Sequence, residues 1–369
     1  MRRLHASAII AVLLVVCAGG CAFAQAVQDI ELHGYMLNRF YANPDSTARF
    51  AMERVSLSAV GKLGQDGTAY IEVYYHPWLT DRVLGTAPNQ FTAEQGRVYM
   101  ESAYVDLPWA GGRIRIGKGR HLAFGMTPSY PNRKTTQYGI LSETFTQDRI
   151  QGFQYVYKKD ALDFAASLTT DLRIGSRSAG EFPGVESSKV VRHFCERDDN
   201  ANLSGRLAGS VKLGVSKPNV QAHISGAVGK LVQADADFIG GQYGFSAGAN
   251  TNRDHNKWGA DVIYNWGPYV AQSEWYQGNF SFLKVTGYNV LVGYQPKEGR
   301  KAYLRWAALN NDRPTNPERP LTWDIQQFTV GIVQPIRKGV WAEFQYEKNK
   351  EKGGSVDNDL LFVEFFTGF

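Results

Sequence analysis

Basic side chains recur at even spacings within stretches of this chain that alternate between apolar and polar residues. In a β-strand, alternate residues face the same side, so residues at an even spacing would share one face. Positive groups gathered on one wetted face attract anions from solution. We therefore treat these side chains as candidate residues for ion selectivity. They are Arg54, Lys62, Arg113, Arg115, Arg206 and Lys212.

A second group of basic residues lies in a long connection, residues 118–148. Its basic members outnumber its two acidic residues, Glu143 and Asp148. If this connection folds towards the face that carries the basic strand residues, small anions should be preferred. The basic members are Lys118, Arg120, His121, Arg133 and Lys134.

The second half of the chain carries acidic residues at the corresponding positions, with Lys301 and Arg305 as exceptions. Basic and acidic groups on opposing walls would produce an electric field between them. Such a field orients dipolar solutes and favours neither sign of charge strongly. The acidic positions are Asp261, Glu274, Glu343, Glu347 and Glu364.

Signals for catalysis and for cofactors are poor. The sequence contains no His-Glu-x-x-His motif and no glycine-rich phosphate loop. Its seven histidines are scattered, and none shows the spacing of metal ligands. The formal net charge of +5 is a mild excess that does not indicate a nucleic-acid partner. We predict that the protein is not an enzyme and binds no cofactor, metal or nucleic acid.

The last stretch, residues 357–369, determines the fold class that we predict. Leu361, Val363 and Phe365 share one face, and Glu364 points the other way. So apolar a final strand suits a barrel whose outer face meets lipid and whose last strand closes against the first. The terminal Phe369 also resembles the assembly signal of bacterial outer-membrane proteins. The alternative is a core strand of a soluble sandwich.

The same alternation recurs along the rest of the chain, and short and long connections follow one another in turn. This pattern is typical of a transmembrane barrel with short turns at one end and longer loops at the other. The fold class that we predict is all-β, an antiparallel transmembrane barrel of 16 strands. If 189–195 and 243–248 are also strands, the number is 18. The 16 predicted strands are 30–37, 50–63, 69–75, 99–107, 113–117, 150–157, 162–169, 203–213, 220–230, 257–265, 269–276, 284–294, 301–308, 326–333, 340–347 and 357–369.

The amino terminus indicates export. Arg2 and Arg3 precede an apolar run that is too short to span a bilayer, and a small-x-small cleavage pattern ends at Ala24. The predicted organisation is a signal peptide, residues 1–24, and one barrel domain, residues 25–369. The alternative is a lipoprotein anchored through Cys21. Cleavage leaves Cys195 alone, so we expect no internal disulfide.

Two further patterns carry expectations. Residues 171–202 mix basic and acidic side chains, which favours a solvated external loop. Aromatic residues near strand ends suggest belts at the two membrane interfaces. Tyr70 and Tyr74 are the one hint of an aromatic track for sugars. The expected belt residues are Tyr35, Tyr75, Tyr157, Trp258, Trp275, Trp306 and Tyr346.

Several short motifs resemble the phosphate-selective porins O and P. They occur in the expected order and strand context over most of the chain. They are Ile116-Gly117-Lys118 leading to Phe124-Gly125, then Asp148-Arg149-Ile150-Gln151-Gly152, then the stretch 259–268, then Ser273-Glu274-Trp275, and finally Phe369.

The resemblance implies a 16-stranded porin of the bacterial outer membrane, often a homotrimer, with the long loop after strand five folded into the pore. The phosphate-binding residues of that family cannot be matched one by one here. The expected function is passive diffusion of small hydrophilic solutes with a mild preference for anions. The alternatives are a phosphate or oxyanion channel and a non-conducting structural or adhesive barrel. The expected partners are small hydrophilic or anionic solutes, outer-membrane lipid and lipopolysaccharide.

Overall fold

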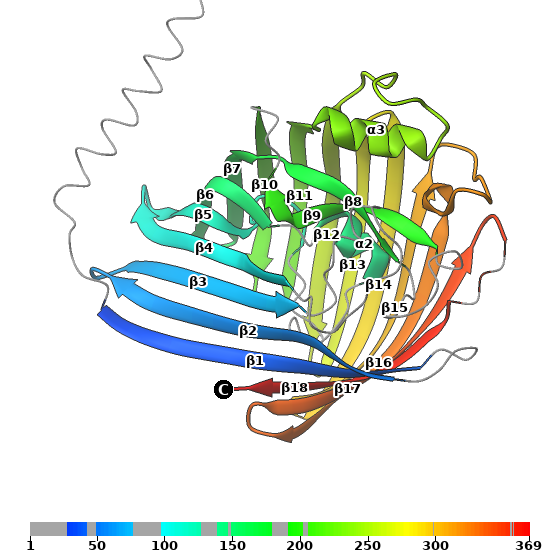
Figure 1. Cartoon of the computed structure of the whole chain (residues 1–369). Coiled ribbons are helices and arrows are strands. Elements are labelled where there is room, and N and C mark those ends of the chain that lie inside the picture. Colours follow the sequence, from blue (N-terminus) through cyan, green and yellow to red (C-terminus); the bar gives the residue numbers. More distant parts are fainter. Residues whose placement is uncertain are drawn as a thin grey trace, which may run out of the picture.

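A computed structural model describes residues 28–42, 49–76, 97–126, 139–146, 149–178, 191–201, 206–297, 299–354, 356 and 358–369. Sixteen strands form one closed antiparallel barrel (Figure 1), which confirms the predicted fold class. The barrel strands are β1 (Gln28–Ala42), β2 (Arg49–Leu63), β3 (Gly67–His76), β4 (Arg97–Trp109), β5 (Gly112–Arg120), β6 (Arg149–Lys159), β7 (Leu162–Thr170), β10 (Leu207–Lys217), β11 (Val220–Lys230), β12 (Asp254–Trp266), β13 (Tyr269–Phe280), β14 (Leu283–Lys297), β15 (Arg300–Asn311), β16 (Ile325–Arg337), β17 (Val340–Glu351) and β18 (Leu360–Gly368).

The remaining elements belong to long connections. Two strands, β8 (Leu172–Ser178) and β9 (Arg192–Ala201), pair only with each other, so the 18-strand alternative is wrong for the barrel. Residues 243–248 form turns rather than a strand. The helices are α2 (Gly139–Phe145), α3 (Gln233–Gly241) and the 3₁₀ turn η4 (Pro320–Thr322). None of the helices in the described residues is long and apolar enough to cross a membrane.

The barrel has two unlike ends, which we name the turn end and the loop end. At the turn end, β-strands follow each other across short connections such as Gly64–Asp66, Ala110–Gly111 and Gly267–Pro268. The start of β1 and the end of β18 also lie there. The loop end carries the long connections, including those that contain α2, the β8–β9 hairpin and α3 (Figure 1).

The ring closes where β1 pairs with β18, from Tyr35 opposite Gly368 to Ala42 opposite Leu361. Beyond the strand, the backbone N–H of Gly34 donates to the carbonyl of Phe369 (2.8 Å), and the N–H of Phe369 donates back (2.9 Å). A barrel closed in this way leaves no strand edge unpaired.

Side chains on the outer face are apolar along each strand. Exposed examples are Leu57 and Ile71 on neighbouring strands and Leu213 on the opposite side. Aromatic residues bound this apolar zone on β12, where Trp258 lies towards the loop end and Trp266 at the turn end. Eight residues at ~3.3 Å each, tilted by ~40°, place the two rings about 20 Å apart in height. That height suits the hydrocarbon zone of a bilayer.

Aromatic rings of neighbouring strands meet at both levels. At the turn end, the rings of Tyr264, Trp266, Tyr269 and Tyr294 follow one another at 4.9–5.7 Å. Towards the loop end, Trp258 and Trp275 meet edge to face at 4.5 Å. The prediction that Tyr35 belongs to a belt is wrong. It lies opposite Ser56 on an inward row, and its hydroxyl donates to that of Tyr74 (2.9 Å).

An inward ion pair joins the two closing strands. Arg39 of β1 donates through Nε to Glu364 of β18 (2.6 Å), and both side chains are almost completely buried. Tyr41 and Glu53 complete the network beside them. The closing seam is therefore polar on its inner face.

We expect Arg39→Met to destabilise the folded barrel by about 3–5 kcal/mol, because Glu364 would keep a buried charge without its partner. The double variant Arg39→Met with Glu364→Gln should recover most of that loss. Urea unfolding, followed by the heat-modifiable mobility of the folded band, measures both. Equal instability of the single and double variants would contradict this view of the seam.

Candidate functional site

Helix α2 lies inside the barrel against the inner face of β13, β14 and β15. Two inward glycines make room for it: a Cβ on Gly287 would stand 2.2 Å from Leu141, and one on Gly278 would stand 3.0 Å from Phe145. At the start of the helix, Gly139 rests on the guanidinium of buried Arg305. The long loop after β5 therefore enters the interior, as the resemblance implied.

The segment before α2 in the chain follows the same inner wall. The N–H groups of Gly125 and Met126 donate to the hydroxyls of Ser225 (3.0 Å) and Tyr276 (3.0 Å). The side chain of Met126 packs in a small apolar cluster with inward residues such as Tyr303. Residues 121–126 thus line β11–β15 from within.

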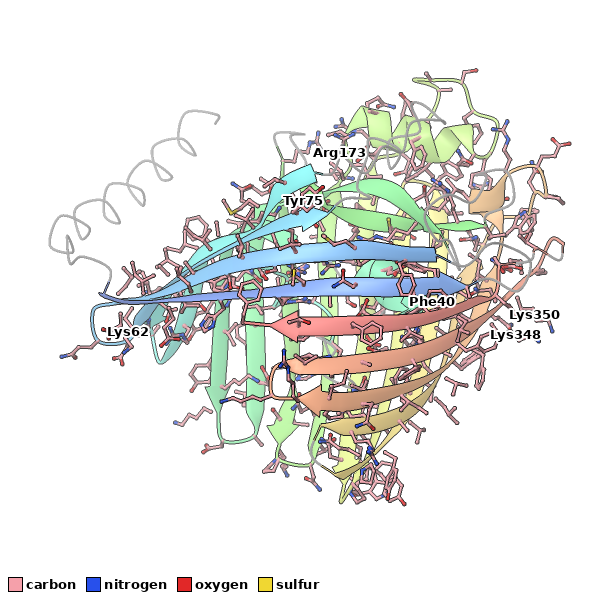
Figure 2. The ribbon with its side chains drawn as sticks, turned by 60° about the horizontal axis from the view of Figure 1, so that its bottom comes forward. Phe40, Lys62, Tyr75, Arg173, Lys348 and Lys350 are labelled. Atoms are coloured by element: carbon pink, nitrogen blue, oxygen red, sulfur yellow. The ribbon has the colours of Figure 1, made fainter. Side chains whose placement is uncertain are left out.

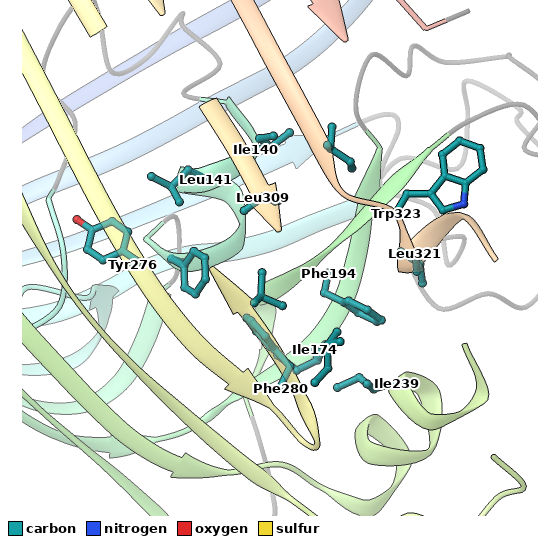
Figure 3. Packing of buried hydrophobic residues seen from close by; sticks show 14 of the residues in the cluster. Ile140, Leu141, Ile174, Phe194, Ile239, Tyr276, Phe280, Leu309, Leu321 and Trp323 are labelled. Carbon is teal, nitrogen blue, oxygen red and sulfur yellow. The ribbon is translucent and has the colours of Figure 1, made fainter. Parts of the chain in front are cut away.

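The β8–β9 hairpin also folds into the interior, and this overturns, for the described residues of 171–202, the expectation of a solvated external loop. Ile174 and Phe194 are buried in an apolar cluster with α2, α3 and the inner faces of β13–β16 (Figure 3). Below, "the plug" means residues 121–126, α2, β8 and β9. It fills the loop-end part of the interior beside β12–β16.

Buried ionic contacts attach the plug to the barrel wall. Lys257 of β12 reaches Glu196 of β9 (2.8 Å) and donates to the carbonyl of Phe145 at the end of α2 (3.0 Å). His255 lies between Asp171 (2.9 Å) and Glu196 (2.8 Å). One wall strand thus holds both inserted segments.

Further contacts join the inserted segments to each other. His193 of β9 lies 3.2 Å from Glu143 of α2. Arg173 of β8 forms a bidentate pair with Asp235 of α3 (2.9 Å to each oxygen). Among the described residues of 171–202, the charges of Asp171, Arg173, His193 and Glu196 are therefore used in internal contacts.

The pKa values of two carboxyls, those of Glu143 in α2 and of Asp171 just before β8, are lower than usual. Burial alone would raise the pKa of Asp171, but His255 and the N–H of Leu172 outweigh it. Burial likewise opposes ionisation of Glu143, and His193 outweighs it to lower the pKa. Both groups therefore stabilise the plug as anions.

The candidate basic residues of the strands occupy different places. Arg54 faces the interior and lies over the ring of Tyr74 (4.7 Å to its centroid), and it forms no ion pair among the described residues. Arg115 faces the interior too, but it makes a bidentate pair with Asp106 (2.8 Å for both bonds). Lys212 points inward and donates to the carbonyl of Gly125 in the plug (3.2 Å).

Other candidates lie away from the middle of the interior. Lys62 and Arg113 are exposed at the turn end, where Lys62 pairs with Asp29 (2.8 Å). Arg206 is exposed at the loop end, just before β10. Lys118 of β5 is opposite Ala103 of β4, which is opposite the outward Ile71 of β3. Lys118 therefore lies on the outer face.

Three candidates remain. Arg120 is half-buried at the end of β5, and its carbonyl accepts a hydrogen bond from Gln154 (2.8 Å). Arg133 and Lys134 lie outside the described residues.

The five acidic candidates of the second half, Asp261, Glu274, Glu343, Glu347 and Glu364, are all buried on inward rows. Sequence reasoning missed inward carboxylates in the first half. Asp106 pairs with Arg115, Glu101 with Arg149, and Glu53 lies near Arg39. The first-half wall is thus not simply basic, which weakens the expected field across the interior.

A serine motif also escaped the sequence reasoning. Gly244-Phe245-Ser246-Ala247-Gly248 has the spacing of a nucleophile elbow. An elbow needs a strand-to-helix turn, whereas Ser246 lies in an exposed turn after α3. Its side chain forms no hydrogen bond with any described residue, and nothing there activates it. Nor do any three described His, Cys, Asp or Glu side chains gather to hold a metal ion.

Comparisons with known structures agree on the barrel. Salmonella typhi OmpF, solved with daunomycin, matches with a TM-score of 0.60 and 12% identity over 92% of this chain and 97% of that one. The anion-selective porin of Comamonas acidovorans matches with a TM-score of 0.54 and 13% identity over 92% of this chain and 99% of that one. The fold is that of the outer-membrane porins.

The trimer form of Vibrio cholerae OmpT, described as an outer membrane protein, matches with a TM-score of 0.55 and 12% identity over 92% of this chain and 99% of that one. No family model matches the chain, and no curated protein is similar enough in sequence to match. The porin fold that the resemblance to phosphate-selective porins implied is thus confirmed, and membership of that family stays a prediction.

Gly287→Leu should displace α2 from the wall, because the space for its side chain is already filled by Leu141. We expect faster protease cleavage within 139–146 in the folded protein. Gly209→Leu is the matched control, since a Cβ there meets nothing closer than 3.9 Å. Equal cleavage of the two variants would refute the packing of α2 described here.

Acid should loosen the plug. A carboxyl whose pKa falls on folding stabilises the native state above its ordinary pKa, here 3.8 for Asp171 and 4.5 for Glu143. That contribution is lost as the pH falls through the lowered values. Protease sensitivity of β8–β9 should rise below about pH 4 in the native protein. Asp171→Asn with Glu143→Gln should show a raised but flatter profile, and an unchanged profile would count against these contacts.

Proposed function

We propose that this protein is an outer-membrane channel through which small hydrophilic solutes diffuse passively. The observation that carries the proposal is the contrast between the two barrel faces. The outer face is apolar between two aromatic belts, and the inward rows are rich in charged and polar groups. Hydrocarbon on one side and water on the other account for that contrast.

In this proposal the route for solutes runs beside β1–β6, because most of the plug lies beside β12–β16, although β9 and Leu122 reach β4 and β6. Inward side chains on the β1–β6 side include Arg39, Arg54, Arg115 and Glu101. Tyrosines lie between them: the rings of Tyr74 and Tyr99 meet edge to face at 5.8 Å, and those of Tyr70 and Tyr104 are tilted by 31° at 5.1 Å. Such a wall offers both charge and hydrogen bonds to a passing solute.

A mild preference for anions centres on Arg54. Arg39, Arg115 and Arg149 each face a carboxylate at salt-bridge distance, which cancels most of their field. Arg54 has no such partner in the described part of the chain, and its Nε makes no hydrogen bond. That atom is itself buried, but the Arg54 side chain as a whole is partly exposed to the interior, so a passing anion would be attracted by its charge. The anion-selective porin among the structural neighbours makes the preference plausible for this fold.

Arg54→Glu should shift the reversal potential in a salt gradient towards cations. The anion-to-cation permeability ratio should fall at least about fivefold, because the substitution changes the charge by two units and each unit contributes roughly 1 kcal/mol at close range in a wetted pore. Planar-bilayer recording measures it, with Lys62→Glu as the control at the turn end. An unchanged ratio in Arg54→Glu would exclude Arg54 as the selectivity residue, and an absence of stepwise channels would exclude the porin function.

A phosphate or oxyanion channel is the narrower alternative. It requires several basic groups without carboxylate partners. Arg39, Arg115, Arg149 and Arg305 face acids, whereas Arg54 forms no ion pair among the described residues and Lys212 donates to a backbone carbonyl. Micromolar to millimolar phosphate that blocks chloride conductance would support this alternative. Indifference to phosphate would reject it.

The plug favours a second alternative, a structural or adhesive barrel that does not conduct. Eighteen buried residues form its apolar cluster, which no general diffusion route requires. A folded barrel without conductance would identify this case.

The same proposal includes the assembly and the location. Residues 1–24 would be removed as a signal peptide on export to the bacterial outer membrane, and three copies would associate, as the trimer form of OmpT does. We propose no enzymatic activity, because the chain offers no activated nucleophile in the described residues.

A further inference from the structure

Two lysines stand on the outer face of β17 at its loop end. Lys348 and Lys350 are exposed and lie two residues apart, so they point to the same side (Figure 2). Towards the turn end, the outer face beside them is apolar or aromatic. Phe344 lies further towards the turn end on the same row, and Leu361 lies on the neighbouring strand.

The register places these lysines beside outward aromatic residues. Lys348 is opposite Phe328 of β16, and Phe328 is opposite Trp306 of β15. Lys350 lies two residues nearer the loop end of β17, opposite Gln326. An ammonium group without an anionic partner is costly in hydrocarbon, so the two lysines mark the level where hydrocarbon gives way to lipid headgroups.

The charges of these lysines are not compensated within the described part of the protein. Neither lysine forms an ion pair there. Asp359, the acidic residue just before the neighbouring strand β18, already accepts hydrogen bonds from the hydroxyl of Tyr346 (2.7 Å) and the N–H of Asn349 (2.9 Å). Lys352, just beyond the strand, faces Asp324 at 3.7 Å. The exposed lysine Lys62, at the opposite end, is by contrast paired with Asp29.

We propose that Lys348 and Lys350 bind the phosphate groups of lipopolysaccharide in the outer leaflet. An ammonium group at headgroup height attracts an anionic lipid, and phosphate is a good acceptor for lysine. Phe328, directly opposite Lys348, supplies an aromatic surface for the acyl chains below the phosphates. The site is a surface of the barrel wall and is independent of the solute that passes through the interior.

The test compares lipid A carrying its phosphates with lipid A from which they have been removed, using folded full-length protein in detergent. Native mass spectrometry counts bound lipid over a concentration series. Each lysine near an anionic lipid surface contributes on the order of a fivefold factor in affinity. Lys348→Ala with Lys350→Ala should therefore weaken binding of phosphorylated lipid A by about tenfold or more.

Two controls separate charge from fold. Lys62→Ala should leave binding unchanged, and Lys348→Arg with Lys350→Arg should retain it. Removing the phosphates should weaken binding to wild type about as much as the double alanine variant does. Equal binding by the alanine variant, or equal affinity for both lipids, would overturn the proposal. Because the readout is bound lipid and not current, failure here leaves the proposed channel function untouched.

Discussion

The pairing of every backbone donor and acceptor around a closed ring is the constraint on which this structure depends. A strand in hydrocarbon has no water to satisfy its N–H and C=O groups, so a ring without edges is required. Once the ring closes, each side chain has two possible destinations, outside or inside. The apolar outer rows and the charged inner rows follow from that choice.

The plug departs from a simple water-filled interior. Near the loop end, β13–β16 carry apolar residues on inward rows, such as Phe280, Val285 and Ile325. These would be costly against water, and the inserted α2 and β9 cover them. Ionic contacts through Lys257 then set the position of the insertion. An apolar core thus forms inside a barrel whose outer face is already apolar.

The alternation of residues in the sequence was enough to predict the 16 barrel strands and the closing role of the last one. The strand 220–230 was predicted with its observed bounds, whereas 203–213 began and ended four residues early. The inward acids of the second half were predicted because strict alternation holds there. The inward fold of the β8–β9 hairpin could not be predicted in this way, because the sequence of 171–202 shows the same mixture of charges whether water or protein surrounds them.

Two of the missed features did leave signals in the sequence. The tight turn at Ala110–Gly111 sets Asp106 opposite Arg115, so their pairing follows from the hairpin register. Inward apolar residues and the inward glycines Gly278 and Gly287 broke the expected pattern and marked the wall that α2 covers. The pair of Glu101 and Arg149 left no such signal, because a register irregularity near Glu101 moves it out of the regular alternation.

The pairing of β1 with β18 has a consequence for biogenesis. Arg39 and Glu364 are separated by 325 positions in the chain. Contacts between such distant positions carry a large loop-closure entropy and form slowly. Until they form, the free sides of β1 and β17 can pair with other chains. The nascent polypeptide must therefore be kept from premature association until its carboxyl-terminal strand is available.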